Sequence, residues 1–175
     1  VLVGILAGGR SMQEIAKISK DKTIKGFIGN PVSETQIVRN LEKITPSQIH
    51  AVHELSLSLA LLDVVSSAYR GVRQYIDIDA TARELYGSQE GVEVGYLGND
   101  TLGSCYQYLL FRNDHLNSLV WGTVRAGSAH SQNNIVGYLS MILPLFGGTW
   151  NLAIRADAGY YNEAVFDVCH ENRTY

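Results

Sequence analysis

The chain has 175 residues, of which 46% are hydrophobic and 18% are charged, so it can bury one good core, or a modest core beside a small helical appendage. It contains no run of about eighteen uninterrupted apolar residues, because Ser56, Ser58 and Asp63 interrupt the richest stretch, residues 55–65. We therefore expect a globular protein without a membrane span.

The chain opens on Val1 without an initiating Met or a basic leader, which favours truncation over removal of a secretory signal. Its two cysteines, Cys105 and Cys169, form no C-x-x-C pair, so we expect neither a disulfide framework nor a zinc site. His170 beside Cys169 lacks a second pair of ligands, and we interpret both residues as structural. A reducing cytoplasm fits these features best.

The net charge of −3 hides an uneven distribution. Residues 1–75 hold nine Lys or Arg and six Asp or Glu, a balance of +3, whereas residues 76–175 hold five and eleven, a balance of −6. A basic first part suits a grip on phosphate groups, and an acidic second part suits the binding of cations. Acidic surfaces also serve solubility alone, so the charge distribution is only suggestive.

Capping signals predict helices in the first part of the chain. Ser11 and Ser33 each precede a Glu or Gln by three residues, the spacing at which the two side chains satisfy free backbone donors at a helix start. Thr45 repeats the pattern, and Pro46 follows it at the first helical position, where a missing N–H costs nothing. The segment 26–31 (GFIGNP) predicts a break between helices.

The helix after Ser33 is expected to be amphipathic, with Ile37, Leu41 and Ile44 on one apolar stripe. The opposite face would read DNA from a helix-turn-helix-like unit or would simply be solvated. Its residues are Gln36, Arg39, Asn40 and Lys43. The basic balance of the first part favours the DNA-binding interpretation without excluding the other.

Near Gly71 the pattern changes from helical to strand-like. We predict a helical, helix-turn-helix-like DNA-binding region over residues 1–71 and a second domain over residues 72–175. Residues 75–79 alternate Ile with Asp, so that Asp77 and Asp79 project from one face of a strand.

Further strands are expected at 104–111 and 116–124, joined by a turn at 112–115. The pattern then predicts a helix over 133–146 that Gly147 and Gly148 end, a strand over 151–157, a helix over 162–171, and the start of a strand at Thr174. Three hairpin-linked strands followed by alternating helix and strand is the order of an α/β fold with an RNase H-like mixed sheet.

Two carboxylates stand at predicted strand ends. Asp79 lies toward the end of the first strand and Asp157 ends the fourth. If these strands are neighbours, as RNase H-like topology requires, the two carboxylates meet at one edge, where clustered negative charge usually implies a bound cation. Mg²⁺ prefers such oxygen ligands. An Asp at a strand end is also a common turn former or helix cap, so spacing alone leaves both interpretations open.

Four segments resemble, in order and spacing, the successive signatures of DDE transposases from bacterial insertion sequences. They are 75–81 (YIDIDAT), 86–91 (YGSQEG), 125–131 (RAGSAHS) and 154–160 (IRADAGY). The resemblance implies that Asp79 and Asp157 are two of the three catalytic acids and bind Mg²⁺, with Mn²⁺ as the alternative ion, in a phosphodiester-cutting site. Asp77, on the same strand face as Asp79, is the reserve candidate for the first position and for metal binding.

The resemblance also implies a partner and a setting. It implies a bacterial, nucleoid-associated cytoplasmic protein, a homodimer when intact, that binds double-stranded DNA at terminal inverted repeats. It would hydrolyse the strand end and direct the freed 3′-hydroxyl at target DNA. The first part of the chain shares the family's S-x-T-x-x-R-x-L segment loosely, through Ser33, Thr35, Arg39 and Leu41.

The family's third acid, a Glu on a helix far downstream, has no counterpart up to Tyr175, and Glu163 and Glu171 belong to a different helix. We therefore expect a transposase fragment, truncated at both ends and inactive by itself. Two alternatives stay open: a catalytically dead DNA-binding remnant or inhibitor of transposition, and a small RNase H-like nuclease acting on RNA hybrids. His130, near the start of a helix, is interpreted as structural.

Overall fold

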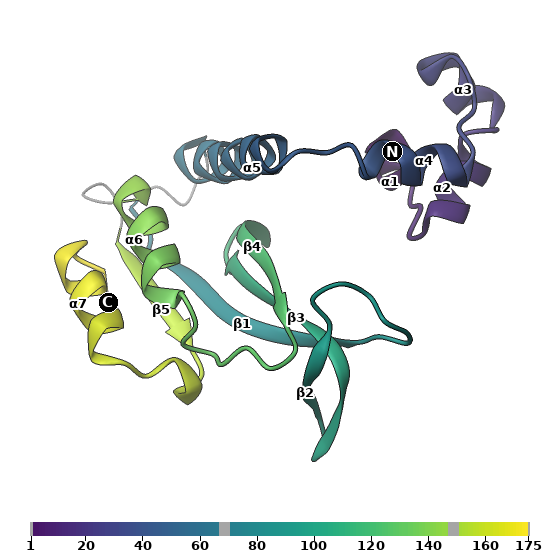
Figure 1. Cartoon of the computed structure of the whole chain (residues 1–175). Coiled ribbons are helices and arrows are strands. Elements are labelled where there is room, and N and C mark those ends of the chain that lie inside the picture. The colour runs from purple at the N-terminus through teal and green to yellow at the C-terminus, as the bar shows by residue number, and fades with distance from the viewer. Residues whose placement is uncertain (1, 67–70, 147–150, 175) are drawn as a thin grey trace. The chain divides into compact units, whose positions relative to one another are not determined.

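The computed structural model describes residues 2–66, 71–146 and 151–174 (Figure 1). The chain divides into two compact units, Val1–Val52 and His53–Tyr175. The domain boundary predicted at Gly71 stays a prediction. The ending of a helix by Gly147 and Gly148 lies outside the described residues. None of the helices in the described ranges is long and apolar enough to cross a membrane.

The first unit is made of short helices whose starts follow local capping chemistry. They are α1 (Leu2–Leu6), α2 (Met12–Ile18), α3 (Lys22–Ile28) and α4 (Glu34–Leu41). Ser11 and Ser33 cap α2 and α4 as predicted, because their hydroxyl oxygens each accept a bond from a backbone N–H three residues on, at 3.2 Å. Asp21 caps α3, a helix that the sequence analysis missed. The predicted break therefore begins at Gly29, which has φ +78, and not at residue 26.

A small core holds the first unit together. Ile15, Ala16 and Ile37 are buried, and Val32 packs against them. The predicted apolar stripe is wrong beyond Ile37, since Leu41 is 38% exposed and Ile44 44% exposed. The physical reason is that α4 ends at Leu41, so the chain turns away from the helical path before Ile44.

Helix α5 (Pro46–Ser66) begins at the predicted cap. The Thr45 N–H donates to Gln48 Oε1 at 2.9 Å, and the Gln48 N–H donates to Thr45 Oγ1 at 3.3 Å, which is the reciprocal pattern of a capping box. Within the second unit, Leu57 is buried in the main core. The ring of His53 lies 4.4 Å from that of Trp121.

The second unit is built on a mixed sheet of five strands among the described residues. The strands are β1 (Gln74–Glu84), β2 (Glu93–Gly98), β3 (Thr101–Asn113), β4 (Ser118–Ala126) and β5 (Leu152–Ala156). Their order is β2-β3-β1-β5, with β4 also paired to β3. β5 runs parallel to β1, and every other pairing is antiparallel. This mixed α/β arrangement is compatible with the predicted RNase H-like fold.

Three details of the strand prediction are wrong. The sequence analysis missed strand β2. A two-residue turn joins β2 to β3, and its residues Asn99 and Asp100 have the positive φ values, 49° and 57°, that such a hairpin turn requires. The turn predicted at 112–115 lies at 114–117, because β3 keeps pairing through Asn113. The predicted strand at Thr174 is also wrong for that residue, which is buried and outside any strand; Tyr175 lies outside the described residues.

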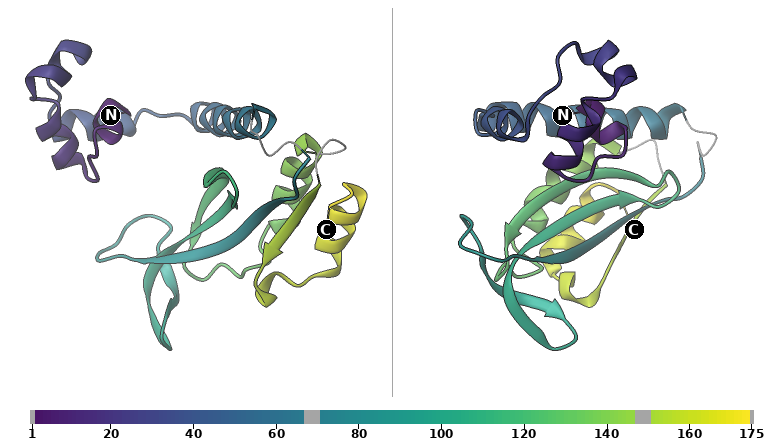
Figure 2. Two further views of the ribbon diagram at one scale, coloured as in Figure 1. Left: turned by 180° about the vertical axis from the view of Figure 1, so that it is seen from behind. Right: turned by 90° about the vertical axis from the view of Figure 1, so that its right-hand side faces the viewer.

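Helices α6 (Ile135–Phe146) and α7 (Glu163–Glu171) lie within the ranges predicted for them (Figure 2). They share one buried apolar cluster with the inward strand residues, among them Ile76 and Ile78 of β1. The predicted alternation in β1 is therefore confirmed. Val120 and Trp121 are both buried although adjacent, because the β3–β4 register shifts there and inserts an extra residue.

We predict that Gly127→Ala destabilises the second unit by about 1–3 kcal/mol, the usual range for overpacking. A Cβ at Gly127 would lie 2.3 Å from the carbonyl oxygen of Glu93 and 2.7 Å from that of Cys105. Urea unfolding measures the effect. Gly26→Ala is the matched control, because a Cβ there meets nothing within 4 Å. Equal stability of the two variants would contradict the close approach at Gly127.

Candidate active site

The two candidate acids lie at the same end of the β1–β5 pairing. The prediction that Asp79 lies toward the end of its strand is wrong, because β1 keeps pairing with β3 as far as Glu84 and Asp79 stands in its middle. The parallel register of β1 and β5 pairs Ile78 with Ala156, so the next residue along each chain is Asp79 and Asp157. The strands are adjacent, with no strand between them. Two carboxylates remote in sequence thus occupy equivalent positions at one end of a strand pair.

Both carboxylates are exposed, and among the described residues each accepts a hydrogen bond from a nearby backbone N–H. Asp79 Oδ1 accepts a bond from the Ala80 N–H at 2.8 Å. Asp157 Oδ1 accepts one from the Gly159 N–H at 2.8 Å and caps the short 3-10 helix η1 (Ala158–Tyr160). Within the described ranges, neither carboxylate makes an ion pair of 4 Å or less.

The charges of both candidate acids affect the pKa of the Tyr160 hydroxyl. The side chain of Tyr160 is 4% exposed, and burial is the largest cause that raises the pKa of its hydroxyl. The positive charge of Arg125 opposes that rise, while the negative charges of Asp157 and of Asp79 add to it. The hydroxyl therefore lies within electrostatic range of one cation and both candidate acids.

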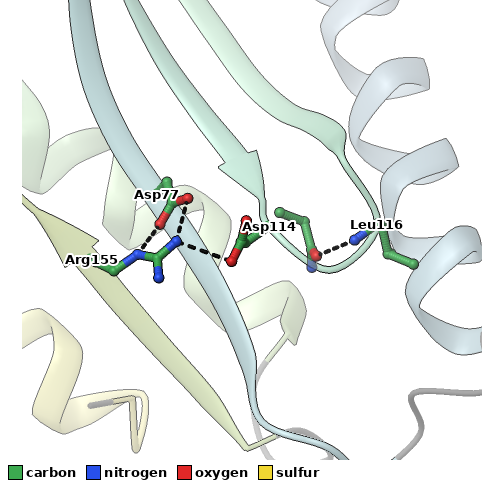
Figure 3. A network of polar contacts seen from close by, with 5 residues as sticks. Asp77, Asp114, Leu116 and Arg155 are labelled. Carbon is green, nitrogen blue, oxygen red and sulfur yellow. Dashed lines mark hydrogen bonds and ion pairs between the residues drawn. The ribbon is translucent and has the colours of Figure 1, made fainter.

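Asp77, the reserve candidate, is engaged elsewhere (Figure 3). Arg155 of β5 donates to its two carboxylate oxygens, from Nε at 2.6 Å and from Nη2 at 2.8 Å. The same Nη2 donates to Asp114 at 3.1 Å, and the guanidinium carbon lies 5.3 Å from the centre of the Tyr75 ring. A bidentate pair of this kind neutralises Asp77 without a metal ion.

The segment that follows β4 lies beside Asp157. A Cβ built on Gly159 would stand 3.0 Å from Asp157 Oδ1 and 3.1 Å from Ser131 Oγ, so Ser131 and Asp157 border the same glycine. The side chain of Gln132 reinforces this contact, because its Nε2 donates to the Tyr161 carbonyl oxygen at 3.0 Å. The segment 127–133 is thus packed along the turn that carries the second acid.

Arg125 holds the same segment from within. Its Nη1 donates to the carbonyl oxygens of His130, Ser131 and Asn133 at 3.3, 3.5 and 3.5 Å. Its Nη2 donates to Gln107 Oε1 of β3 at 3.1 Å. Neither Arg125 nor Tyr160 was predicted to belong to the site. Each acts on residues distant in the sequence through tertiary contacts, and no periodic sequence pattern indicates such contacts.

A cavity of about 720 Å³ adjoins the second acid. Asp157 lines it together with apolar side chains of β1, β5 and α7, among them Ile78, Ile154, Val165 and Phe166. The candidate site is therefore exposed at the end of β5 and adjoins an apolar cavity.

The residues proposed for DNA contact belong to the first unit. Gln36, Arg39 and Asn40 are exposed on α4, whereas Lys43 is exposed in the turn after it. Glu163 and Glu171 lie in the first turn and at the last position of α7. In the described part of the chain, no three His, Cys, Asp or Glu residues gather closely enough to hold a metal ion together.

The second unit thus holds two acids side by side on adjacent parallel strands of a mixed α/β sheet. The family model described as "Transposase DDE domain group 1" matches residues 1–175, the whole chain. The chain belongs to this transposase family, which confirms the resemblance drawn from the sequence.

No curated protein matches the chain. A solved structure described as "Crystal structure of the Mos1 Strand Transfer Complex" is similar over 99% of this chain, with a TM-score of 0.36 and 8% sequence identity. The chain spans 55% of the length of that structure's chain. A likeness at that level supplies no residue-by-residue correspondence.

The Asp77 ion pair predicts a pH dependence of stability. Its hydrogen bonds from Arg155 are the largest cause that lowers the pKa of Asp77 below its ordinary 3.8. The pKa of Asp77 is thus lower in the folded protein than in the unfolded chain. The ion pair stabilises the fold fully above the unfolded-state pKa, and this stability is lost as the pH falls through the folded-state pKa. We expect Asp77→Asn to be less stable than the unsubstituted chain near neutral pH, and the two to converge as the pH falls through the lowered pKa of Asp77. Thermal unfolding across this range measures it; parallel curves would contradict the pair.

Proposed function

We propose that this chain is part of an insertion-sequence transposase that binds double-stranded DNA at terminal inverted repeats and cuts and joins phosphodiester bonds with divalent metal ions. Family membership supports transposition as the process. The observation that carries the metal-dependent chemistry is the β1–β5 register, which sets Asp79 and Asp157 one residue beyond a paired position on adjacent parallel strands.

The donor set fits a hard divalent cation. Two exposed carboxylates stand at one end of the β1–β5 pairing, and no Lys, Arg or His of the described residues pairs with either of them. Like charges placed together in this way are stabilised by a cation between them. Mg²⁺, or Mn²⁺, accepts a few carboxylate oxygens and keeps several waters. Asp79 and Asp157 are the residues that would hold it, and Asp77 is the weaker candidate because Arg155 already neutralises it.

Bound metal ions would supply charge neutralisation at the phosphate and activation of water or of a 3′-hydroxyl. The chain's own part is positional. β1 and β5 fix the spacing of the two carboxylates, and the N–H groups of Ala80 and Gly159 orient one oxygen of each. Water or the DNA 3′-hydroxyl would be the nucleophile, so the proposal assigns no nucleophilic side chain.

Helix α4 is the proposed DNA-contacting element of the first unit, through Gln36, Arg39 and Asn40, with Lys43 at its end. Cationic side chains there would bind phosphates, and the two amides could contact base edges. The same proposal places the intact protein as a homodimer at the bacterial nucleoid. The chain alone is expected to bind ions and DNA yet to cut poorly, since a third acid is part of the family's site.

The metal proposal predicts that Asp79→Asn and Asp157→Asn each weaken Mn²⁺ binding roughly ten-fold or more, because each removes one negative ligand from a paired site. Isothermal titration calorimetry of the 175-residue chain measures the affinity, and circular dichroism checks the fold. Asp100→Asn is the matched control, because Asp100 is an exposed acid in the β2–β3 turn. Unchanged affinity in either site variant would remove that residue from the site. DNA binding without ion binding would instead favour the non-catalytic remnant.

The DNA proposal predicts a loss of salt-dependent affinity. We expect Arg39→Ala and Lys43→Ala each to weaken binding to duplex DNA and to reduce the slope of log K against log salt by about 1, the change for one lost phosphate contact. Fluorescence anisotropy at several salt concentrations measures this slope. Lys25→Ala, which removes an exposed cation from α3, is the control. An equal change in the control would indicate a diffuse charge effect and not a contact by α4.

A further inference from the structure

We propose that the segment Gly127–Gln132 is a preformed DNA-contacting loop of the site, and that His130 is its substrate-contacting side chain, donating a hydrogen bond to a phosphate of the DNA strand held at Asp79 and Asp157. This inference rests on the proposed function. It assigns a role to a residue that the sequence analysis interpreted as structural.

The place of the loop is the first argument. Ser131 Oγ and Asp157 Oδ1 lie 3.1 and 3.0 Å from the same point, the position of a Cβ on Gly159. His130 directly precedes Ser131 and is exposed. A strand of DNA whose phosphate reaches the second acid therefore passes next to His130.

The rigidity of the loop is the second argument. Gly127 is wedged against β2 and β3, and its carbonyl oxygen accepts a bond from Gln107 Nε2 at 3.0 Å. Ser128 donates to Glu93. At the other end, Asn162 Nδ2 donates to Gln132 Oε1 at 3.2 Å. These contacts, with the bonds from Arg125 to the carbonyl oxygens of His130 and Ser131, position the loop before substrate arrives, which lowers the entropic cost of binding.

The chemistry of the imidazole is the third argument. His130 Nδ1 accepts a bond from the Gln132 N–H at 3.3 Å. In the neutral ring that bond places the proton on Nε2, so the ring presents an N–H donor outward. A phosphate oxygen only accepts hydrogen bonds, so the two are complementary. In the described part of the chain His130 joins no group of three potential metal ligands, which distinguishes this role from metal ligation.

Arg125 gives the loop a second property. Its guanidinium is partly buried behind the loop, and its Nε and the Tyr160 hydroxyl are buried polar atoms that make no hydrogen bond of standard geometry with any described residue, although the two side chains interact electrostatically. A fixed positive charge beneath the loop offsets part of the repulsion between the carboxylates and an incoming phosphate. Arg125 is thus a positioning residue, and His130 the contacting one.

The test measures ion binding and DNA binding separately on the 175-residue chain. Mn²⁺ titration without DNA gives the ion affinity. Fluorescence anisotropy of a labelled duplex oligonucleotide with a recessed 3′ end, with and without Ca²⁺, gives the ion-dependent enhancement of DNA affinity. For His130→Ala we expect unchanged Mn²⁺ affinity and a loss of roughly ten-fold in the enhancement, the effect of one hydrogen bond to a charged group. His130→Gln, which keeps an N–H donor, should restore part of it.

His50→Ala is the matched control, because His50 is also exposed but lies on α5 in the first unit. An enhancement in His130→Ala equal to that of the unsubstituted chain would overturn the role of His130, as would an equal loss in the His50 control. Mn²⁺ affinity that also falls in His130→Ala would assign the residue to the metal site. If Asp79→Asn and Asp157→Asn leave Mn²⁺ affinity unchanged, the proposed function fails by itself, whatever the His130 variants show.

Discussion

The parallel pairing of β1 with β5 is the constraint on which the candidate site depends. The paired residues are far apart in the sequence, and the hydrogen-bonded register between them decides which side chains stand next to one another. That register is held by the core beneath it, where Ile76 of β1 and Leu139 and Ile142 of α6 are fully buried. A one-residue slip of β1 would turn Ile76 from these helix residues toward water, so the core fixes the spacing of the acids.

The same register gives two neighbouring acids different roles. Asp77 and Asp79 share one face of β1, two residues apart. Opposite Asp77 stands Arg155, which neutralises it through two hydrogen bonds. Asp79 and Asp157 each follow the last pair of the register, Ile78 with Ala156, so Asp79 has a second acid beside it. A fixed guanidinium makes the first position a structural ion pair. The second position sets two acids on adjacent strands, and in the proposed function a bound cation would compensate their charge.

Local rules predicted the parts of this structure that depend on nearby residues. Capping patterns located the starts of α2, α4 and α5, and alternation located the buried face of β1. Strand β2 was missed because its burial is slight and its turn relies on two left-handed residues, Asn99 and Asp100. The two acids came from resemblance, since a strand-end Asp has no distinguishing spacing. The support that Arg125 gives to its loop could not be predicted, because it is made to backbone carbonyls that any sequence would provide.

The two units differ in how much apolar surface each buries in its own core. The second unit buries a large cluster drawn from the sheet and its helices, whereas the described core of the first unit is Ile15, Ala16 and Ile37 with Val32 against them. A unit of about fifty residues with so little buried apolar surface is marginally stable by itself. Its helix caps compensate locally, each contributing about 1 kcal/mol. A ligand that binds only the folded form adds stability by mass action. DNA bound to α4 would therefore also stabilise the helices of the first unit. DNA recognition and folding would thus be coupled in the first unit, whereas the large core of the second unit holds the β1–β5 pair without DNA.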